Sequence, residues 1–143
     1  MSTNLSDQEK SEVFGFFDPD KYEEETKEKY GQSSAYKQSQ AKTKNYTKDD
    51  WAQMALESDF IVQKFKNLME KGIDLESVEA KETAEAHRQH ITKWFYNCDY
   101  EIHSSLALMY ISDDRFKENY EKHAQGLAQY VHDAITANSL DNM

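Results

Sequence analysis

The densest group of chemically reactive side chains lies in residues 87–103, whose sequence is HRQHITKWFYNCDYEIH. This segment contains Cys98, the only cysteine of the chain. A thiol is a nucleophile only as its thiolate, and the N-terminus of a helix lowers a thiol pKa. We expect a helix to begin near Asp99, which makes Cys98 a candidate nucleophile. Asp99 and Glu101 oppose this activation, so a buried, unreactive cysteine is the alternative interpretation.

Three of the five histidines lie in the same segment and could join Cys98 in a metal site. His87 and His90 are three residues apart, so they would project from neighbouring positions of a helix. Structural zinc sites use tighter pairs of ligands, such as two Cys-x-x-Cys motifs, and the sequence has none. A haem held by one of these histidines has no further support. We therefore predict neither a metal nor another cofactor, and we expect packed or capping histidines.

Known catalytic motifs do not accompany these residues. The sequence lacks the H-E-x-x-H, P-loop, G-x-S-x-G and dinucleotide-binding motifs. The acidic run Glu23, Glu24 and Glu25 is typical of a solvated helix face rather than of paired catalytic carboxylates. We therefore predict that the protein is not an enzyme and has no catalytic residue.

Composition limits the partners of the protein. A formal net charge of −10 argues against direct contact with nucleic acid or with an anionic membrane surface. No apolar run approaches the roughly 20 residues that span a bilayer. The N-terminal sequence MSTNLSDQEK has neither the basic nor the apolar region of a signal peptide. A single cysteine fits a reducing compartment, so we expect a cytoplasmic protein.

The elements that position these residues are predicted to be helices. Four Gly and one Pro in 143 residues disfavour a fold made of tight turns, and good helix formers dominate the composition. From Thr47 onward, apolar residues recur at helical spacing. We expect a long helix from Thr47 to Gly72 and a second from Asp74 or Leu75 to Tyr96. Shorter helices are expected to start near Asp99, Asp113 and Gly126.

Residues 1–46 have a different composition, because they are rich in aromatic side chains and contain only two Leu, Ile or Val residues. Asp18 and Pro19 predict the start of a short helix that ends near Gly31, and Ser33 predicts the cap of a second. Such short helices bury too little surface to be stable alone. We expect this part to be mobile unless an apolar partner docks against its aromatic side chains.

Three stretches of the chain resemble the TipAS-type antibiotic-recognition domain, the ligand-binding module of some MerR-family transcriptional activators. They are KYEEETKEKYGQSSAYKQSQAKTKNYTKDDW at 21–51, AHRQHITKWFYNCDYEIHSSLALMYISDDRF at 86–116 and GLAQYVHDAI at 126–135. The resemblance covers residues 16–138 in the family's order. It implies an all-α, globin-like fold, a groove for large hydrophobic antibiotics such as thiopeptides, and N-terminal helices that close as a lid over the ligand. We accordingly expect a tail at 1–15 and a ligand-binding domain at 16–143, composed of lid helices 16–46 and a helical core 47–143.

The resemblance also implies a role for Cys98, which matches the position of a cysteine that adds to a dehydroalanine of the ligand in thiopeptide-binding members. This Michael addition needs a thiolate and an alkene held beside it, and it consumes one protein molecule per ligand. Aromatic and apolar side chains are expected to line the groove, and two histidines are expected to donate hydrogen bonds to the ligand. These candidates are Phe16, Phe17, Tyr22, Tyr36, Trp51, His90, Trp94, Phe95, Tyr96, Ile102, His103 and Tyr110. For each aromatic candidate, packing in the core is the alternative.

Full regulators of this family carry an N-terminal DNA-binding winged helix and a dimerising coiled coil, which this chain does not have. We therefore expect either the effector-sensing domain of a regulator or a stand-alone protein that sequesters the drug. In both cases the partner is a hydrophobic peptide antibiotic or a similar small molecule. The alternatives are a helical domain for protein interaction and, third, a metal or haem sensor built on His87, His90, Cys98 and His103.

Overall fold

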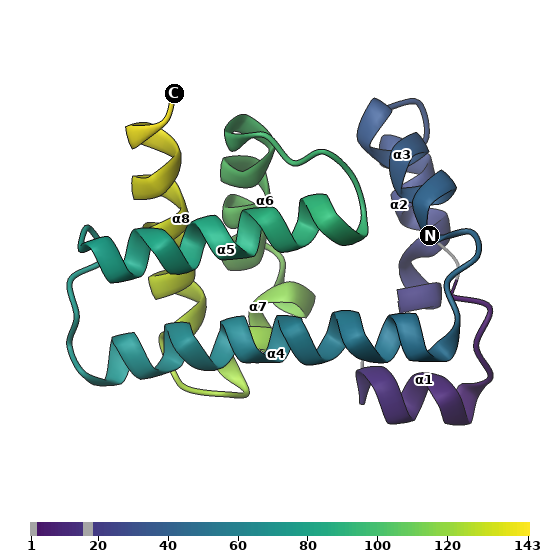
Figure 1. The fold of residues 1–143 in the computed structure, drawn as a ribbon, viewed down its shortest axis with the longest axis horizontal. Coiled ribbons are helices and arrows are strands. Elements are labelled where there is room, and N and C mark those ends of the chain that lie inside the picture. The colour runs from purple at the N-terminus through teal and green to yellow at the C-terminus, as the bar shows by residue number, and fades with distance from the viewer. Residues whose placement is uncertain (1–2, 16–18) are drawn as a thin grey trace. The chain divides into compact units, whose positions relative to one another are not determined.

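All regular structure in the described residues, 3–15 and 19–143, is helical (Figure 1), which confirms the prediction of an all-α fold. The structure is a computed structural model. Its elements are α1 (Asp7–Phe14), the 3-10 helix η1 (Pro19–Tyr22), α2 (Glu23–Tyr30), α3 (Ser34–Thr43), α4 (Lys48–Glu70), α5 (Val78–Trp94), α6 (Tyr100–Ser112), α7 (Asp114–Glu121) and α8 (Leu127–Asp141). Two groove candidates, Phe16 and Phe17, lie outside the described residues, and so does the side chain of Tyr22.

Side-chain caps start most of the helices where the sequence predicts them. The Thr47 amide donates to Asp50 Oδ2 (2.9 Å) and the Asp50 amide donates to Thr47 Oγ1 (3.2 Å), which is the predicted capping box of α4. Gly72 follows α4 with a φ of +68°, a conformation that favours glycine. Asp99 starts α6 by accepting a hydrogen bond from the Ile102 amide at 2.8 Å. The other predicted caps are also confirmed, at Ser33, Asp113 and Gly126.

The second long helix begins later than the sequence predicts, at Val78 instead of Asp74 or Leu75. Asp74 Oδ1 accepts a hydrogen bond from the Glu76 amide at 2.7 Å, which holds these residues in a turn. Ser77 Oγ then accepts from the Ala80 amide at 3.1 Å. The side chain of Asp74 therefore competes with the helix, and Ser77 caps the helix in its place.

Residues 1–15, which we expected to be a tail, contain the helix α1. Ser6 and Glu9 form a capping box at its start, with the Glu9 amide 3.2 Å from Ser6 Oγ and the Ser6 amide 3.1 Å from Glu9 Oε1. This signal is local and stands in the sequence, but the sequence prediction missed it. Pro19 starts a 3-10 helix rather than an α-helix.

The chain divides into two compact units. Unit 1 consists of Met1–Ser58 and His90–Asn97, and unit 2 consists of Asp59–Gln89 and Cys98–Met143. The long helices α4 and α5 therefore contribute residues to both units.

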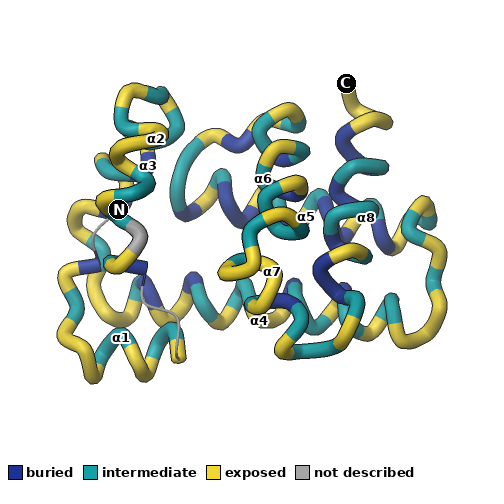
Figure 2. Tube along the Cα trace, turned by 180° about the vertical axis from the view of Figure 1, so that it is seen from behind, coloured by how far each residue is buried: buried dark blue, intermediate teal, exposed yellow. Residues whose placement is uncertain are grey.

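Unit 2 contains an aliphatic core in which α6 lies against α7 and α8. Small side chains also belong to this core, namely Ala80 and Ala84 of α5 and Ala107 of α6. Figure 2 shows the buried stretches of α8 in dark blue. The largest fully buried members of this core are Phe65, Leu127, Val131 and Ile135.

Unit 1 is held by a small aromatic cluster, which consists of buried Trp51, Met54 and Trp94 with partly buried neighbours. These neighbours are Leu5, Val13, Phe14, Tyr46 and Phe95. By contrast, α1 and α2 bury no residue completely, and the buried residues of α3 are Ser39 and Thr43. The three short helices therefore add little to the burial of apolar surface in unit 1.

Candidate ligand-binding residues

Three of the predicted groove aromatics, Trp51, Trp94 and Phe95, meet in the aromatic cluster of unit 1. Tyr46 links the two tryptophans: its ring centroid lies 5.2 Å from that of Trp51 and 5.6 Å from that of Trp94, edge-on in both cases. Its hydroxyl donates to the Trp94 carbonyl at 2.5 Å. The centroid of the Phe14 ring lies 5.8 Å from that of Trp51, also in an edge-to-face contact. In this state the rings contact one another, and such edge-to-face contacts add to the energy of burial.

The two tryptophans differ in their polar atoms. Trp94 Nε1 donates to Glu57 Oε1 at 2.8 Å. Trp51 is completely buried, and its Nε1 has no acceptor among the described residues. A buried donor without an acceptor costs free energy, so Trp51 is the member of the cluster that gains most from an acceptor on a ligand.

Within unit 1, Glu57 of α4 accepts hydrogen bonds from Lys93 and Trp94 of α5. Burial of this carboxyl opposes its ionisation, but hydrogen bonds outweigh burial and lower its pKa to about 2. The donors are Gln53 (2.9 Å), Trp94 (2.8 Å) and Lys93 (3.0 and 3.1 Å). Glu57 is therefore an anion that fixes the orientation of the Trp94 ring.

The remaining candidates of unit 1 also have partners within the unit. His90 is buried, its Nε2 lies 3.0 Å from the Met54 carbonyl oxygen, and burial lowers the pKa of its ring. The Tyr36 hydroxyl donates to Glu23 Oε1 at 2.8 Å, which ties α3 to α2. Tyr96 is half-buried at the end of the unit. In this structure His90 Nε2 faces the Met54 carbonyl, and a hydrogen bond from His90 to a ligand stays a prediction.

In unit 2, His103 lies in the core rather than at a surface. Its side chain is fully buried, and its Nε2 is 2.8 Å from His87 Nδ1. His87 Nε2 is in turn 3.5 Å from the Tyr120 hydroxyl. Burial lowers the pKa of His103 to about 4, so the ring is neutral. In this structure His103 is hydrogen bonded to His87, and its predicted hydrogen bond to a ligand stays a prediction.

Ile102 and Tyr110, the other two candidates on α6, are half-buried. The Tyr110 ring lies 5.1 Å from the Tyr120 ring and 6.0 Å from that of His87. Tyr110 therefore belongs to the same aromatic and histidine cluster as His103.

Cys98 precedes the capping residue of α6, as the sequence predicts, but its thiol is neither exposed nor activated. The side chain is fully buried, and its Sγ lies 3.7 Å from the Asp99 carbonyl oxygen. Burial raises the pKa of the thiol to about 12, since the charge of Arg88 lowers the pKa less than burial raises it. The thiol is therefore buried in this structure, and its addition to a ligand stays a prediction.

The described residues contain no group of three or more His, Cys, Asp or Glu side chains that could hold a metal ion. His87 and His103 are hydrogen bonded to each other. Within the described part of the chain, no helix is long and apolar enough to cross a membrane.

Sequence analysis missed Glu57, Tyr46 and the pair of Glu85 with Arg88. The pair had a local signal, since opposite charges three residues apart face each other on a helix. The contacts that join Glu57 and Tyr46 to Trp94 had none, because Trp94 lies 37 and 48 residues away from them in the sequence.

The helices and the packed aromatic side chains define an all-α domain, and comparison with known proteins assigns its family. A profile of the TipAS antibiotic-recognition domain matches residues 22–138. The chain belongs to this family.

Two transcriptional activators show the extent of the similarity. The HTH-type transcriptional activator TipA of Streptomyces coelicolor is 47% identical over 140 residues, which cover 98% of this chain and 55% of the relative. The HTH-type transcriptional activator mta of Bacillus subtilis is 31% identical over 114 residues, which cover 80% of this chain and 43% of the relative. The chain therefore spans about half the length of the curated relatives it matches.

Two solved structures are also similar. TipAS from Streptomyces lividans in complex with nosiheptide, described as part of a thiopeptide antibiotic multidrug resistance system, has a TM-score of 0.93 and 46% identity, covering 99% of both chains. The antibiotic-binding domain of a TipA-class multidrug resistance transcriptional regulator has a TM-score of 0.61 and 40% identity, covering 65% of this chain and 99% of the other. These matches confirm the fold and the family that the sequence indicates.

Proposed function

We propose that this chain binds thiopeptide antibiotics as the effector-sensing domain of a transcriptional activator. The observation that carries this proposal is the similarity to TipAS solved with nosiheptide, which extends over 99% of both chains. Relatives with about twice the chain length are HTH-type activators, which supports the role of a sensing domain in the cytoplasm. The net charge of −10 supports a chain that leaves contact with DNA to other parts of such a regulator.

Burial of aromatic and apolar surface supplies the binding energy in this proposal, at about 25 cal/mol for each Å² removed from water. The candidates are the groove residues predicted from sequence, and Trp51 also offers a buried N–H donor that finds no acceptor within the described part of the chain. Residues 16–46 act as the lid, because their helices bury few side chains of their own. Ordering this segment subtracts from the gain in free energy on binding.

We propose that capture begins without a covalent bond and that addition at Cys98 requires the thiol to be uncovered first. In the addition, the thiolate sulfur bonds to the terminal carbon of a ligand dehydroalanine, and a proton from solvent completes the thioether. A buried thiol with a raised pKa supplies almost no thiolate at neutral pH. Reversible burial of the antibiotic therefore precedes any thioether.

Titration calorimetry with nosiheptide, followed by intact mass spectrometry of the denatured complex, tests the proposal. We expect saturable binding to the wild type and to Cys98→Ala, because the aromatic residues are unchanged. We expect unmodified protein after brief incubation, and any slow adduct should disappear in Cys98→Ala. Absence of nosiheptide binding would overturn the proposed function. A rapid adduct in the wild type would overturn the order of steps and leave the function intact.

A further inference from the structure

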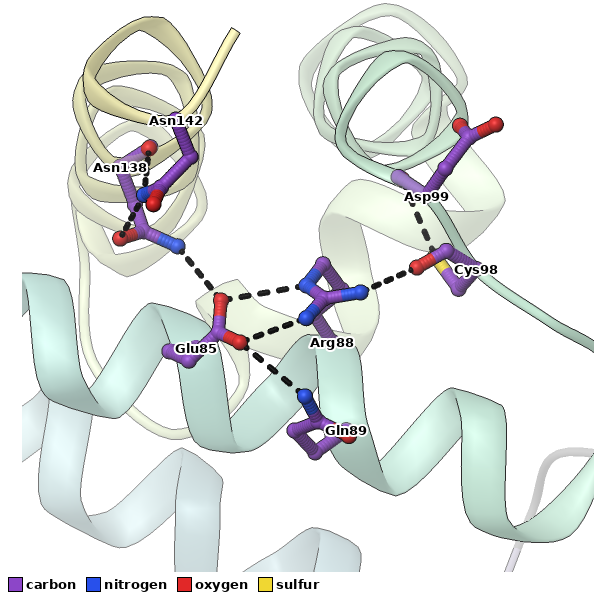
Figure 3. A network of polar contacts seen from close by, with 7 residues as sticks. All are labelled: Glu85, Arg88, Gln89, Cys98, Asp99, Asn138 and Asn142. Atoms are coloured by element: carbon purple, nitrogen blue, oxygen red, sulfur yellow. Dashed lines mark hydrogen bonds and ion pairs between the residues drawn. The ribbon is translucent and has the colours of Figure 1, made fainter.

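Arg88 is the centre of a polar network in unit 2 that holds the backbone at Cys98 (Figure 3). Its Nε donates to Glu85 Oε1 at 3.1 Å and its Nη2 donates to Glu85 Oε2 at 2.6 Å. Its remaining terminal nitrogen, Nη1, donates to the Cys98 carbonyl oxygen at 2.7 Å. One guanidinium therefore connects an acidic side chain of α5 to the residue that precedes the cap of α6.

The surroundings of Arg88 keep this arrangement rigid. The guanidinium lies 4.2 Å from the centroid of the Tyr100 ring, at cation–π distance. Its side chain is 13% exposed, so water competes weakly for its hydrogen bonds. Asn138 of α8 donates to Glu85 Oε1 at 3.1 Å and Gln89 donates to Glu85 Oε2 at 3.1 Å. The Glu85 carboxylate that accepts from Arg88 is therefore also held by side chains of α8 and α5.

The same network accounts for the state of the Cys98 side chain. The carbonyl of Cys98 is held by Arg88, and the next residue, Asp99, is fixed as the cap of α6. Between these two constraints the thiol is completely buried. We expect a backbone movement at Cys98 that exposes the thiol to break the hydrogen bond from Arg88.

We propose that Glu85 and Arg88 form a clamp that holds Cys98 buried, so that this pair governs access to its thiol. The positive charge of Arg88 favours the thiolate form of Cys98. Its hydrogen bond to the Cys98 carbonyl keeps the thiol buried, and this burial outweighs the effect of the charge on the reactivity of the thiol. For antibiotic capture the inference rests on the proposed function, since a thioether at Cys98 then forms only after the clamp opens. The accessibility of the thiol itself does not depend on any ligand.

Labelling of the full chain with 5,5′-dithiobis(2-nitrobenzoate) measures this accessibility. The Cys98 thiolate attacks one sulfur of the reagent, a mixed disulfide forms, and one thionitrobenzoate anion leaves and is counted by its absorbance. Glu85→Gln removes the ion pair but keeps the shape, and Arg88→Lys keeps the charge but loses the forked geometry. Because each variant weakens the pair of Arg88 and Glu85, whose side chains are 13% and 33% exposed, we expect the labelling rate to rise by about tenfold.

Tyr130→Phe is the matched control in unit 2, because it removes one hydrogen bond, from the Tyr130 hydroxyl to the Ile73 carbonyl (2.9 Å), far in sequence from Cys98. It should label at the wild-type rate. Chemical denaturation of every variant shows whether the labelling occurs in folded protein. If the clamp acts through its geometry, Arg88→Lys should label fast although its charge is retained. In the wild type, opening of the clamp should limit the rate, so labelling at saturating reagent should become independent of reagent concentration.

Unchanged labelling in both Glu85→Gln and Arg88→Lys would overturn the clamp. Equal acceleration in Tyr130→Phe would also overturn it, because the thiol would then report general loosening. Nosiheptide binding measured on the same variants is a separate readout. If the wild type does not bind nosiheptide, the proposed function is refuted, whereas the labelling result for the clamp still stands.

Discussion

His103 and its neighbours show how burial decides the protonation of a side chain. His103 Nδ1 is buried and has no partner among the described residues, whereas its Nε2 faces His87 Nδ1. An unpaired buried N–H costs more than an unpaired lone pair, so we assign the proton of His103 to Nε2. His87 then accepts at Nδ1 and donates from Nε2 toward the Tyr120 hydroxyl. A second proton on His103 would have no acceptor and would lie near the positive charge of Arg88.

Unit 2 should lose stability as the pH falls from about 6.5 to 4. The folded pKa of His103 is about 4 and its ordinary value is 6.5, so between these values the unfolded chain binds a proton that the folded protein does not. Stability is complete above pH 6.5 and falls by up to about 3 kcal/mol toward pH 4. Urea denaturation at a series of pH values measures this slope, and His103→Gln should flatten it.

Two other effects are separable from that slope. His90 also has a pKa lowered by burial, so some pH dependence persists in His103→Gln. Glu57 and Glu85 have pKa values lowered to about 2, so the stability linked to them is lost only as the pH falls below about 4.5. Equal slopes in wild type and His103→Gln between pH 6.5 and 4.5 would refute the assignment.

At the scale of elements, α6 depends on a single side chain at its start. Asp99 accepts from the Ile102 amide at 2.8 Å, and its charge lies at the positive end of the helix dipole. Asp99→Ala should lower the free energy of unfolding by about 1 kcal/mol. Asp99→Asn keeps an acceptor and should lose much less, as thermal denaturation would show. Equal losses in both variants would mean that the charge, and not the hydrogen bond, stabilises the helix start.

The starts of α4 and α6 could be predicted because their signals are local. Thr47 with Asp50, and Asp99 alone, bond to amides within three residues, so side-chain type and spacing suffice. The contacts of the candidate site are not local. The sequence offered a set of aromatic candidates, but the choice between ring packing and ligand contact depends on partners such as Tyr46 for Trp94, 48 residues apart. The hydrogen bond from Arg88 to the Cys98 carbonyl could not be predicted either, because every residue has a backbone carbonyl and the residue type does not show which one accepts.

At the scale of the whole molecule, the two units have separate buried clusters of different character. Unit 2 has a core of aliphatic and small side chains from five helices, and unit 1 has a few aromatic rings. Since α1 and α2 bury no residue completely, unit 1 has fewer fully buried side chains than unit 2 among the residues that the structure describes. Local opening follows such differences in burial.

Trp51→Ala should therefore act mainly on unit 1. Loss of this fully buried ring should cost about 3–5 kcal/mol in the unit that contains it. Hydrogen exchange should accelerate in residues 19–46 and remain slow in α8, whereas Phe65→Ala should accelerate exchange in α8. In the wild type, nosiheptide should slow exchange in residues 19–46. Uniform acceleration across both units in Trp51→Ala would show that the units open together.

Both tryptophans of the chain, Trp51 and Trp94, belong to the aromatic cluster of unit 1. Indole emission excited at the red edge of absorption therefore originates entirely from that unit, and the tyrosines of unit 2 stay dark. The protein thus carries its own optical reporter. A shift in emission wavelength records a change around the aromatic cluster, while far-ultraviolet dichroism follows the helices of both units, and comparing the two signals separates local from general unfolding without an attached dye.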